Sequence, residues 1–308
     1  LFVFQRTPQY TIPARHGNVD KKVLADIKSR YDEVWEKARW SPAGLPYDLV
    51  ERSALEVSDE ERRKVYEAGW EQGGFYFAGA SFTDVAIDRR ANDTAAEFIR
   101  SKIREIVKDP ETAEKLVPTD HPFGSKRALI DTDYFETYNR DNVTLVDIRH
   151  FPIQEITPNG IKTEEGEFEL DVIIFATGFD AMTGSYNRID IQGKGGEKLK
   201  DHWAEGPKTY LGLSSAGFPN MFMITGPGSP SVLSNMPVSI EQHVEWISGL
   251  VEYMREHGVD TAEADAEAEK AWVAHVNELA SMTLFMLADS WYMGANIPGK
   301  PRVFMPYP

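Results

Sequence analysis

Two neighbouring polar residues near the start of the chain could hold the phosphate of a nucleotide. Arg6-Thr7 follows an apolar run, Leu1–Phe4, that predicts a short buried parallel strand. In nucleotide-binding βαβ folds the second strand ends beside the adenosine ribose. There an acidic residue binds the 2′-hydroxyl of NAD, whereas a cation accommodates the 2′-phosphate of NADP. A cation followed by a hydroxyl at this position is the pattern expected of an NADP site. Taken alone, however, this segment favours the simpler interpretation that Arg6 is an ordinary surface arginine.

Lys126 and Arg127 are a second candidate pair. They lie side by side in a loop, between Gly124 and an apolar stretch. Adjacent loop cations are usually solvated, but here a strongly acidic chain places two of them together. One could bind a phosphate while the other stabilises an oxyanion.

A third motif, Ala176–Asp180, closes a stretch that alternates and then becomes wholly apolar, Phe168–Ala176. That stretch predicts a buried strand. Gly178 permits a sharp turn or a close backbone approach to a ligand. An ordinary exit from a strand is the alternative, and we favour the functional interpretation.

The loop Gly226–Ser231 spells G-x-G-x-x-S after an expected strand, Met221–Thr225. We reject the dinucleotide fingerprint, because Pro227 and Pro230 disturb its tight turn and no acidic residue follows at the required distance. The loop leads to an expected helix start at Ser239. It could therefore still aim backbone N–H groups at an electron-rich cofactor edge.

Trp291 could give its indole N–H to a sugar hydroxyl, although core packing is the usual fate of a tryptophan. The seven histidines include no pair at metal-ligand spacing, and His243 and His257 are interpreted as surface residues. The chain has no cysteine, which excludes thiol catalysis and disulfides. No metal site is expected.

Length and charge bound the remaining possibilities. With 308 residues the chain predicts two domains, and its net charge of −16 argues against general nucleic-acid binding. No apolar run approaches the ~20 residues of a membrane-spanning helix, and we expect a cytoplasmic protein. The chain begins and ends in strand-like runs, Leu1–Phe4 and Val303–Met305, so we expect a segment of a larger protein.

Helices interleaved with buried strands predict an α/β protein. Between Asp20 and Val117 the pattern is helical, with a capping box at Ser58 and Glu61 and a stop at Gly73. Later elements are expected over the following ranges: a helix at Ala95–Lys108, a helix capped by Asp109-Pro110, a short helix at Asp131–Tyr138, a strand at Val143–Ile148, a hairpin around Pro158–Gly160, a helix begun by Ser239 and Gln242, and a helix at Ala262–Ala280.

Taken together, the motifs resemble type I Baeyer–Villiger monooxygenases. The resemblance is colinear over essentially the whole chain, and its segments are Phe4–Tyr10, Gly124–Arg127, Tyr138–Val143, Ala176–Asp180, Gly226–Glu245 and Ser290–Lys300. Singly most of them are unspecific, but the set is highly specific. Two stretches, Gly226–Met236 and Ile297–Met305, look most like members that oxidise phenylacetone.

The resemblance implies a flavoprotein with two Rossmann-like domains, one for FAD and one for NADP, and a helical insertion in the latter. Residues 1–19 and 123–179 would belong to the NADP-binding domain. Residues 20–122 would form the insertion, and 180–308 the C-terminal part of the FAD-binding domain. The implied reaction uses NADPH and O2 to insert one oxygen beside a ketone carbonyl, through a peroxyflavin, giving an ester or lactone.

The resemblance also assigns roles residue by residue. Arg127 would be the active-site arginine, which stabilises the peroxyflavin anion. The expected cofactor contacts are Arg6, Thr7 and Lys126 with the 2′-phosphate, Trp291 with the NADP ribose, and Gly226, Pro227, Asn235 and Met236 with FAD. The expected hinge is Thr177, Gly178 and Asp180, and the expected ketone pocket is Ser231, Val232, Leu233 and Met236.

The glycine fingerprints of the family and its F-x-G-x-x-x-H-x-x-x-W-P signature do not occur in this chain. We therefore expect an upstream half to be needed to complete both nucleotide folds. The other expected partners are a small ketone and O2, with no nucleic acid and no membrane. Two alternatives remain: a related flavin monooxygenase that hydroxylates nitrogen or sulfur, and an inactive segment of the parent enzyme. The ketone is not determined, since one methylene changes discrimination by only ~1–3 kcal/mol.

Overall fold

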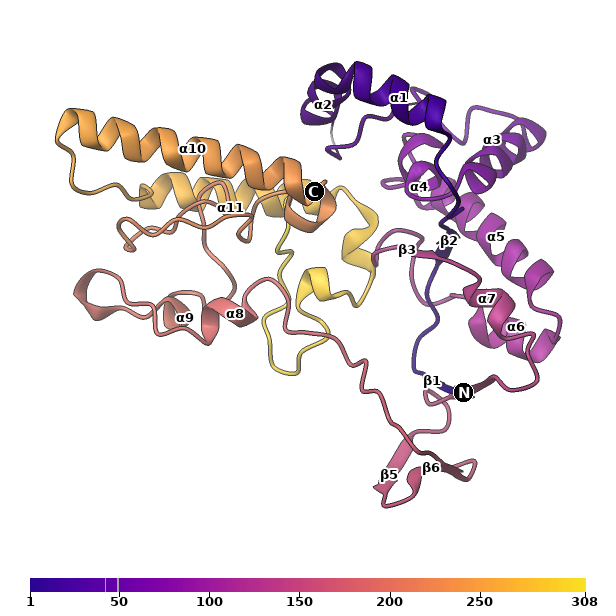
Figure 1. Ribbon diagram of the computed structural model, residues 1–308. Coiled ribbons are helices and arrows are strands. Elements are labelled where there is room, and N and C mark those ends of the chain that lie inside the picture. Colours follow the sequence, from indigo (N-terminus) through magenta and orange to yellow (C-terminus); the bar gives the residue numbers. More distant parts are fainter. Residues whose placement is uncertain (42, 49) are drawn as a thin grey trace. The chain divides into compact units, whose positions relative to one another are not determined.

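The computed structural model describes residues 1–41, 43–48 and 50–308 (Figure 1). The chain divides into two compact units. Unit 1 comprises Leu1–His16, Arg52–Val85 and Arg89–Gly178, and unit 2 comprises Gly17–Glu51, Ala86–Asp88 and Phe179–Pro308. The stretch 20–122, expected as one helical insertion, is thus divided between the two units.

Unit 1 contains seven strands and five α-helices among its described residues. In chain order they are β1 (Phe2–Gln5), β2 (Thr11–Pro13), α3 (Asp59–Gln72), α4 (Tyr76–Ala80), α5 (Arg89–Ile106), α6 (Pro110–Leu116), β3 (Leu129–Asp131), α7 (Tyr134–Thr137), β4 (Thr144–Asp147), β5 (Ile153–Thr157), β6 (Gly160–Thr163) and β7 (Glu167–Glu169).

The strands of unit 1 form three small sheets. β1 pairs with β4 in parallel, so that Gln5 lies opposite Asp147. β2 pairs with β3 in parallel, whereas β5, β6 and β7 form an antiparallel sheet. The carboxyl ends of β1 and β4 therefore lie at one edge. Parallel strands with intervening helices confirm the α/β class.

The core of unit 1 is formed by side chains from β2, α3, α5 and α6. Its largest fully buried side chains are Tyr10, Ile12, Phe77, Ile99, Ile103, Leu116, Phe135 and Val146. Several aromatic rings meet edge to face, as Tyr66 does with Phe82 at a centroid distance of 5.4 Å. The rings supply much of the buried apolar area that stabilises a domain of this size.

Local signals place the helix ends correctly. The Ser58 hydroxyl accepts the backbone N–H of Glu61, and Asp109 caps α6 through the N–H of Thr112. α3 ends at Gln72, and its C-cap Gly73 has a φ of +73°, which suits glycine. A Cβ at Gly73 would also lie 2.4 Å from the Pro13 carbonyl oxygen. These ends were predicted because caps depend on neighbours in sequence.

Two expected strands do not form. In the stretch Phe168–Ala176 only the first residues belong to a strand, β7, and no strand forms beyond Leu170, whose N–H donates to the carbonyl of Asn159 at 2.9 Å. Val172, Ile174 and Phe175 are 74%, 86% and 68% exposed. A strand needs a neighbour to take its backbone hydrogen bonds, and the described chain offers none here. The segment Met221–Thr225 forms no strand for the same reason, because the described chain offers it no neighbouring strand either.

Two further expectations are wrong in detail. The helix expected over Asp131–Tyr138 is only the short α7, because Leu129–Asp131 is used as β3. Val303–Met305 was expected as a strand and is coil.

Unit 2 consists of helices, turns and coil, and the part that the structure describes holds no strand of three or more residues. Its elements are α1 (Lys21–Ser29), α2 (Tyr31–Arg39), α8 (Gly184–Asn187), the 3₁₀ turn η1 (Lys194–Gly196), α9 (Leu199–His202), η2 (Ser231–Leu233), α10 (Met236–His257), α11 (Ala266–Ser281), η3 (Leu284–Leu287) and η4 (Trp291–Met293). None of the described helices in either unit is both long and apolar enough to span a membrane.

The long helix α10 begins earlier than expected. Its N-cap is Asn235, and Ser239 lies inside the first turn, where its hydroxyl oxygen is 2.5 Å from that of Ser234. Pro237, within the first turn, is favourable there because that position needs no N–H donor. The capping pattern at Ser239 was therefore misleading.

His243 on α10 is buried, with 4% of its surface exposed, and is not the surface residue that the sequence suggested. Its Nδ1 accepts the backbone N–H of Thr225 at 2.9 Å, so the neutral ring holds α10 to the Thr225–Gly226 turn. Burial lowers the pKa of His243, and a backbone hydrogen bond with Met223 opposes this only in part.

The buried amide of Asn92 organises the loop that leads to Lys126 and Arg127. Its Nδ2 donates to the carbonyl oxygens of Val85 and Phe123, both at 2.8 Å, and its Oδ1 accepts the N–H of Phe123 at 2.9 Å. One side chain on α5 thus satisfies three backbone groups.

We predict that Asn92→Ala lowers the free energy of unfolding of unit 1 by about 3 kcal/mol or more, because each buried group left without a partner costs ~1–3 kcal/mol. Urea unfolding would measure the loss. Asn277→Ala is the control, since that amide is exposed and bonds only to Val273 of its own helix. Equal losses in the two variants would contradict the role given to Asn92.

A second prediction concerns pH. Because the pKa of His243 is lower in the folded chain than in the unfolded chain, acid protonates the unfolded chain first. The contribution of this residue is present at neutral pH and is lost as the pH falls below about 6.5. We expect His243→Asn, which keeps an acceptor but does not titrate, to flatten the decline in unfolding free energy between about pH 7 and 5. His257→Asn, at the exposed end of α10, should leave the decline unchanged. An unaltered slope in His243→Asn would refute the assignment.

Candidate functional site

The parallel pairing of β1 with β4 brings two cations to one edge in unit 1. Arg6 and Thr7 follow β1, and Arg149 follows β4 two residues after Asp147. The backbone N–H of Ile148 donates to the carbonyl of Gln5 at 3.1 Å, so pairing extends to the point where these residues begin. Arg6 is exposed, and its side chain has no hydrogen-bond or ionic partner within the described chain.

Asp120 brings Lys126 to the same place. Its Oδ2 lies 3.9 Å from Nζ of Lys126 and 3.5 Å from Nη1 of Arg149, and its Oδ1 lies 2.6 Å from Nδ1 of His121. Burial raises the pKa of Asp120, but the hydrogen bond with His121 and the two cations outweigh it, so the pKa lies below its usual value. One ionised carboxylate thus holds Lys126 and Arg149 together.

His121 is fixed between two side chains. Its Nε2 lies 2.9 Å from Oε1 of Gln9, in the segment that follows Arg6 and Thr7. Burial lowers the pKa of His121, and its hydrogen bond with Asp120 opposes this. The ring therefore ties the Arg6 segment to the loop that carries Lys126.

Arg127 is the partly buried neighbour of Lys126. No described residue forms a hydrogen bond or an ion pair with its guanidinium. Gly124, at φ +81°, turns the chain just before the two cations. Because no described residue neutralises it, the charge of Arg127 is available to a ligand, as an electrostatic role requires.

Sequence reasoning missed Arg149, Asp120 and His121. Arg149 follows an expected strand, Val143–Ile148, in the way that Arg6 follows the first one. The signal was present, but only the pairing of the two strands makes their ends neighbours. Asp120 has no local pattern that marks it.

In unit 2 the loop Gly226–Ser229 uses most of its backbone donors internally. The N–H groups of Gly226, Gly228 and Ser229 donate to the carbonyls of Gly212, Met305 and Gly226. Gly226 and Pro227 are buried, and the carbonyl of Pro227 accepts the hydroxyl of Thr209 at 2.6 Å. The expectation that this loop aims its N–H groups at a cofactor edge is therefore wrong for Gly226, Gly228 and Ser229.

The first turn of α10 provides donors instead. The backbone N–H groups of Met236 and Val238 have no partner within the described chain, and Pro237 between them has none to offer. The Asn235 side chain does not cap the helix, because its Nδ2 donates to the carbonyl of Gly44 at 3.0 Å. The N–H of Asn235 donates to Ala43 at 2.9 Å. These orphan donors at a helix N-terminus fit an electron-rich cofactor edge.

Two of the expected pocket residues pack against the same hydrophobic cluster as the expected NADP contact. Val232 and Leu233, in η2, pack with Trp291 against one hydrophobic cluster, whose buried members include Tyr292 and Phe304. Ser231 is buried with φ +47°, an uncommon conformation for serine that sets the direction of the turn. Two motifs far apart in sequence therefore share one apolar core.

The expected hinge lies where the chain passes from unit 1 to unit 2. Thr177 and Gly178 are exposed, and Gly178 has φ +84°. Asp180 is partly buried, and its Oδ1 lies 2.6 Å from Nζ of Lys300. The Ala176–Asp180 motif is thus bonded to the end of the segment Ser290–Lys300.

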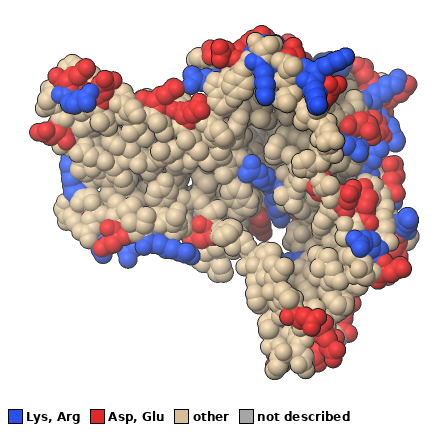
Figure 2. All heavy atoms as spheres, in the orientation of Figure 1, with Lys and Arg blue, Asp and Glu red and all other residues tan. Residues whose placement is uncertain are grey.

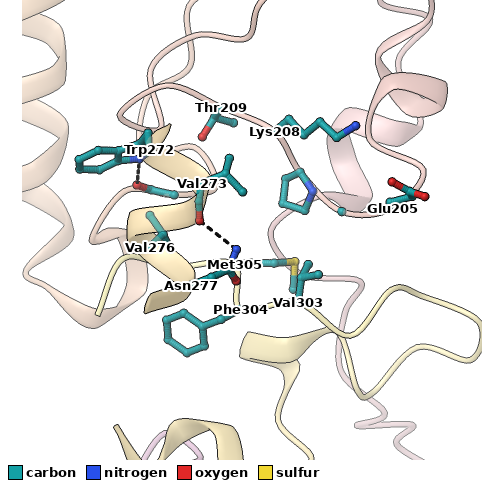
Figure 3. A pocket seen from close by; sticks show the side chains of 13 residues that line it. Glu205, Lys208, Thr209, Trp272, Val273, Val276, Asn277, Val303, Phe304 and Met305 are labelled. Carbon is teal, nitrogen blue, oxygen red and sulfur yellow. Dashed lines mark hydrogen bonds between the residues drawn. The ribbon is translucent and has the colours of Figure 1, made fainter. Parts of the chain in front are cut away.

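A cavity of about 250 Å³ lies between α11 and the C-terminal segment (Figure 3). Trp272, Val273 and Val276 from α11 face Val303, Phe304 and Met305, and Glu205 and Lys208 lie toward one side. The Trp272 indole donates to the carbonyl of Gly228 at 3.0 Å. None of the residues expected to bind ketone or cofactor is among its lining residues.

Among the residues described, no cluster of acidic side chains or histidines is suited to a metal ion.

No family model matches the chain. The chain is 48% identical over 309 residues to a Baeyer–Villiger monooxygenase of Pseudooceanicola batsensis, covering 100% of this chain and 56% of that protein. It is 47% identical over 302 residues to the phenazine N-monooxygenase PhzNO1 of Lysobacter antibioticus, covering 97% of this chain and 55% of that protein.

Solved structures agree with these relatives. The closed crystal structure of cyclohexanone monooxygenase matches with a TM-score of 0.96 and 46% identity, over 99% of this chain and 57% of that one. OTEMO in complex with FAD and NADP matches with a TM-score of 0.95 and 42% identity, over the same shares. The chain spans a little over half the length of the proteins it matches. Over its whole length the chain is therefore similar, in sequence and in fold, to a part of the Baeyer–Villiger monooxygenases.

Proposed function

We propose that this chain works as part of a flavin-dependent Baeyer–Villiger monooxygenase, which uses NADPH and O2 to convert a ketone into an ester or lactone. The observation that carries the proposal is the 48% identity with a Baeyer–Villiger monooxygenase across the whole chain. Unit 1 would contribute to the NADP site and unit 2 to the FAD site. A cytoplasmic location is part of the proposal.

The basic edge of unit 1 would hold the 2′-phosphate of NADPH. Arg6 and Lys126 supply cations, and Thr7 supplies a hydroxyl. Arg149 adds a third cation, because it shares Asp120 with Lys126. A net positive edge on a chain of net charge −16 supports binding of a phosphate at this place.

The chain would contact FAD through the start of α10 and its preceding loop, with Asn235, Met236, Gly226 and Pro227 nearby. When bound, FAD supplies the activation of O2, which no amino-acid side chain provides. Arg127 would stabilise negative charge that develops during the reaction and would orient the nicotinamide. Ser231, Val232 and Leu233 would shape the ketone pocket, and Trp291 would meet the NADP ribose.

The chain would need the part of the protein that corresponds to the unmatched length of its relatives. Support comes from exposed apolar side chains, which are costly to leave in water. They include Val172, Ile174 and Phe175 after β7, and Val244, Trp246, Val251 and Tyr253 on α10. Figure 2 shows broad uncharged areas on the face that it presents. A polypeptide with its own strands would pair with the first group and pack on the second.

A second candidate function is N-oxidation of an aromatic heterocycle. It is favoured by the 47% identity to a phenazine N-monooxygenase over 97% of this chain. The two functions share cofactors and differ in the atom that receives oxygen.

For the first function, the phenylacetone-like stretches Gly226–Met236 and Ile297–Met305 favour aryl or medium-sized ketones as substrates.

The visible absorption spectrum of the purified protein, before any cofactor is added, is the first test. Flavin bands are expected, and NADPH should bleach them. Turnover with cyclohexanone or phenylacetone should then give a lactone or an ester, whereas phenazine should remain unchanged. Formation of a phenazine N-oxide without ester would favour the second candidate. Protein that stays colourless after FAD is supplied would contradict the assignment of a flavin site to the protein as purified.

Two neighbouring variants separate binding from chemistry. Lys126→Ala should weaken NADPH binding about tenfold or more with little effect on NADH, because it removes a charged hydrogen bond to the 2′-phosphate. Arg127→Ala should lower ester formation by at least about 100-fold while the flavin spectrum persists. Lys64→Ala, an exposed lysine paired with Glu60 on α3, is the control and should change neither. Equal loss of NADPH and NADH binding in Lys126→Ala would contradict the phosphate contact.

A further inference from the structure

Among the ion pairs of the described residues, Lys300 has one of the least exposed cationic side chains. Only 10% of its side chain is exposed, and its Nζ lies 2.6 Å from Oδ1 of Asp180 and 2.8 Å from the carbonyl oxygen of Ala181. The equally short pair of Lys194 with Glu263 is on the surface, with 60% of the lysine side chain exposed. Taking an ammonium group out of water costs free energy, so a buried lysine must be compensated by well-placed partners.

A second side chain from the loop that carries Lys300 forms a hydrogen bond with the chain beside Asp180. Nδ2 of Asn296 donates to the carbonyl of Phe179 at 2.9 Å. Asn296 and Lys300 therefore hold three consecutive residues, Phe179–Ala181. These are the first residues of unit 2 after the chain leaves unit 1 at Gly178. We call Phe179–Ala181 the crossover segment.

Two glycines make room for the lysine–aspartate pair. A Cβ at Gly184 would lie 2.6 Å from the carboxyl carbon of Asp180. A Cβ at Gly294 would lie 3.1 Å from Cγ and Cδ of Lys300, and Gly294 has φ +69°. The backbone on both sides thus accommodates the pair, and larger side chains would displace it.

The loop that carries Lys300 and Asn296 is joined to the hydrophobic cluster at its other end. Tyr292 and Met293 are buried members of this cluster, and Trp291 and Leu233 pack against it. The N–H of Gly294 donates to the carbonyl of Trp291 at 3.1 Å. A displacement of the crossover segment would therefore be passed through Lys300 to Trp291.

We propose that Lys300 is a positioning residue that fixes the Trp291-bearing segment to the crossover segment. Asn296 assists it. The pair makes the placement of Trp291 depend on the position of Phe179–Ala181, the point at which the chain enters unit 2. The effect on nucleotide binding rests on the proposed function, whereas the mechanical coupling does not.

The test is hydrogen–deuterium exchange on the protein as purified, comparing wild type with Lys300→Met. Exchange at residues 179–184 and at 290–300 should both rise about tenfold or more, because a charged hydrogen bond that holds both segments is lost. The N–H groups of Thr183 and Gly294 are direct reporters, since they donate to Ala181 and Trp291. Lys194→Met is the matched control and should alter neither segment.

A double-mutant cycle distinguishes loss of the Asp180–Lys300 contact from general unfolding of the protein. Asp180→Asn alone should raise exchange in the same two segments, and Asp180→Asn with Lys300→Met should add little further, because the two side chains act through one contact. Asn296→Ala should produce a smaller rise. Additive effects, a rise in only one segment, or a rise spread over α11 as well would overturn the proposal.

Affinity for NADP⁺ provides the functional readout. Lys300→Met should weaken NADP⁺ binding about tenfold while Lys194→Met leaves it unchanged. Unchanged NADP⁺ affinity in Lys300→Met, with exchange raised in both segments, would overturn the positioning role. Absence of NADP⁺ binding by the wild type would count against the proposed function alone, because the exchange experiment needs no nucleotide.

Discussion

The candidate nucleotide site depends on the parallel pairing of β1 with β4. Phe2 and Thr144, about 140 residues apart in sequence, lie opposite each other in this pair. Without that pairing Arg6 and Arg149 would have no reason to be neighbours. Asp120 then adds Lys126 to the same edge, and the buried amide of Asn92 orders the loop between them. A few short-range polar contacts thus complete an arrangement that the backbone pairing sets up.

In unit 2 the equivalent constraint is a small hydrophobic cluster rather than a sheet. The turn Ser231–Leu233, the segment around Trp291 and the C-terminal Phe304 pack against one another. Polar contacts hold the periphery of this cluster in place. Asn235 bonds to Ala43 and Gly44, and Lys300 bonds to Asp180. The expected cofactor and substrate residues of this unit are therefore fixed by packing, and their backbone donors at the start of α10 stay open.

The exposed apolar stretch after β7 has a physical explanation in the same terms. Val172, Ile174 and Phe175 have the composition of a buried parallel strand, but they are exposed. Hydrophobic composition favours burial, yet a strand also needs a neighbour for its N–H and C=O groups. The described chain provides no such neighbour, so the sequence pattern and the observed conformation differ. The further stretch of polypeptide proposed above would supply that neighbour and would bury these side chains.

The sequence by itself determined the features that depend on near neighbours. The caps of α3 and α6 and the hairpin of β5 and β6 follow from residues close together in the chain, and the family resemblance follows from the order of its motifs along the chain. Tertiary structure decided the rest. Ser239 carries a good capping pattern but lies inside α10, because Asn235 is held by the Ala43–Gly44 turn. His243 looked like a surface residue and is buried, and Arg149 joins the basic edge only through strand pairing. The physical reason is common to all three. Burial and strand register are set by contacts between residues distant in sequence, which local spacing does not encode.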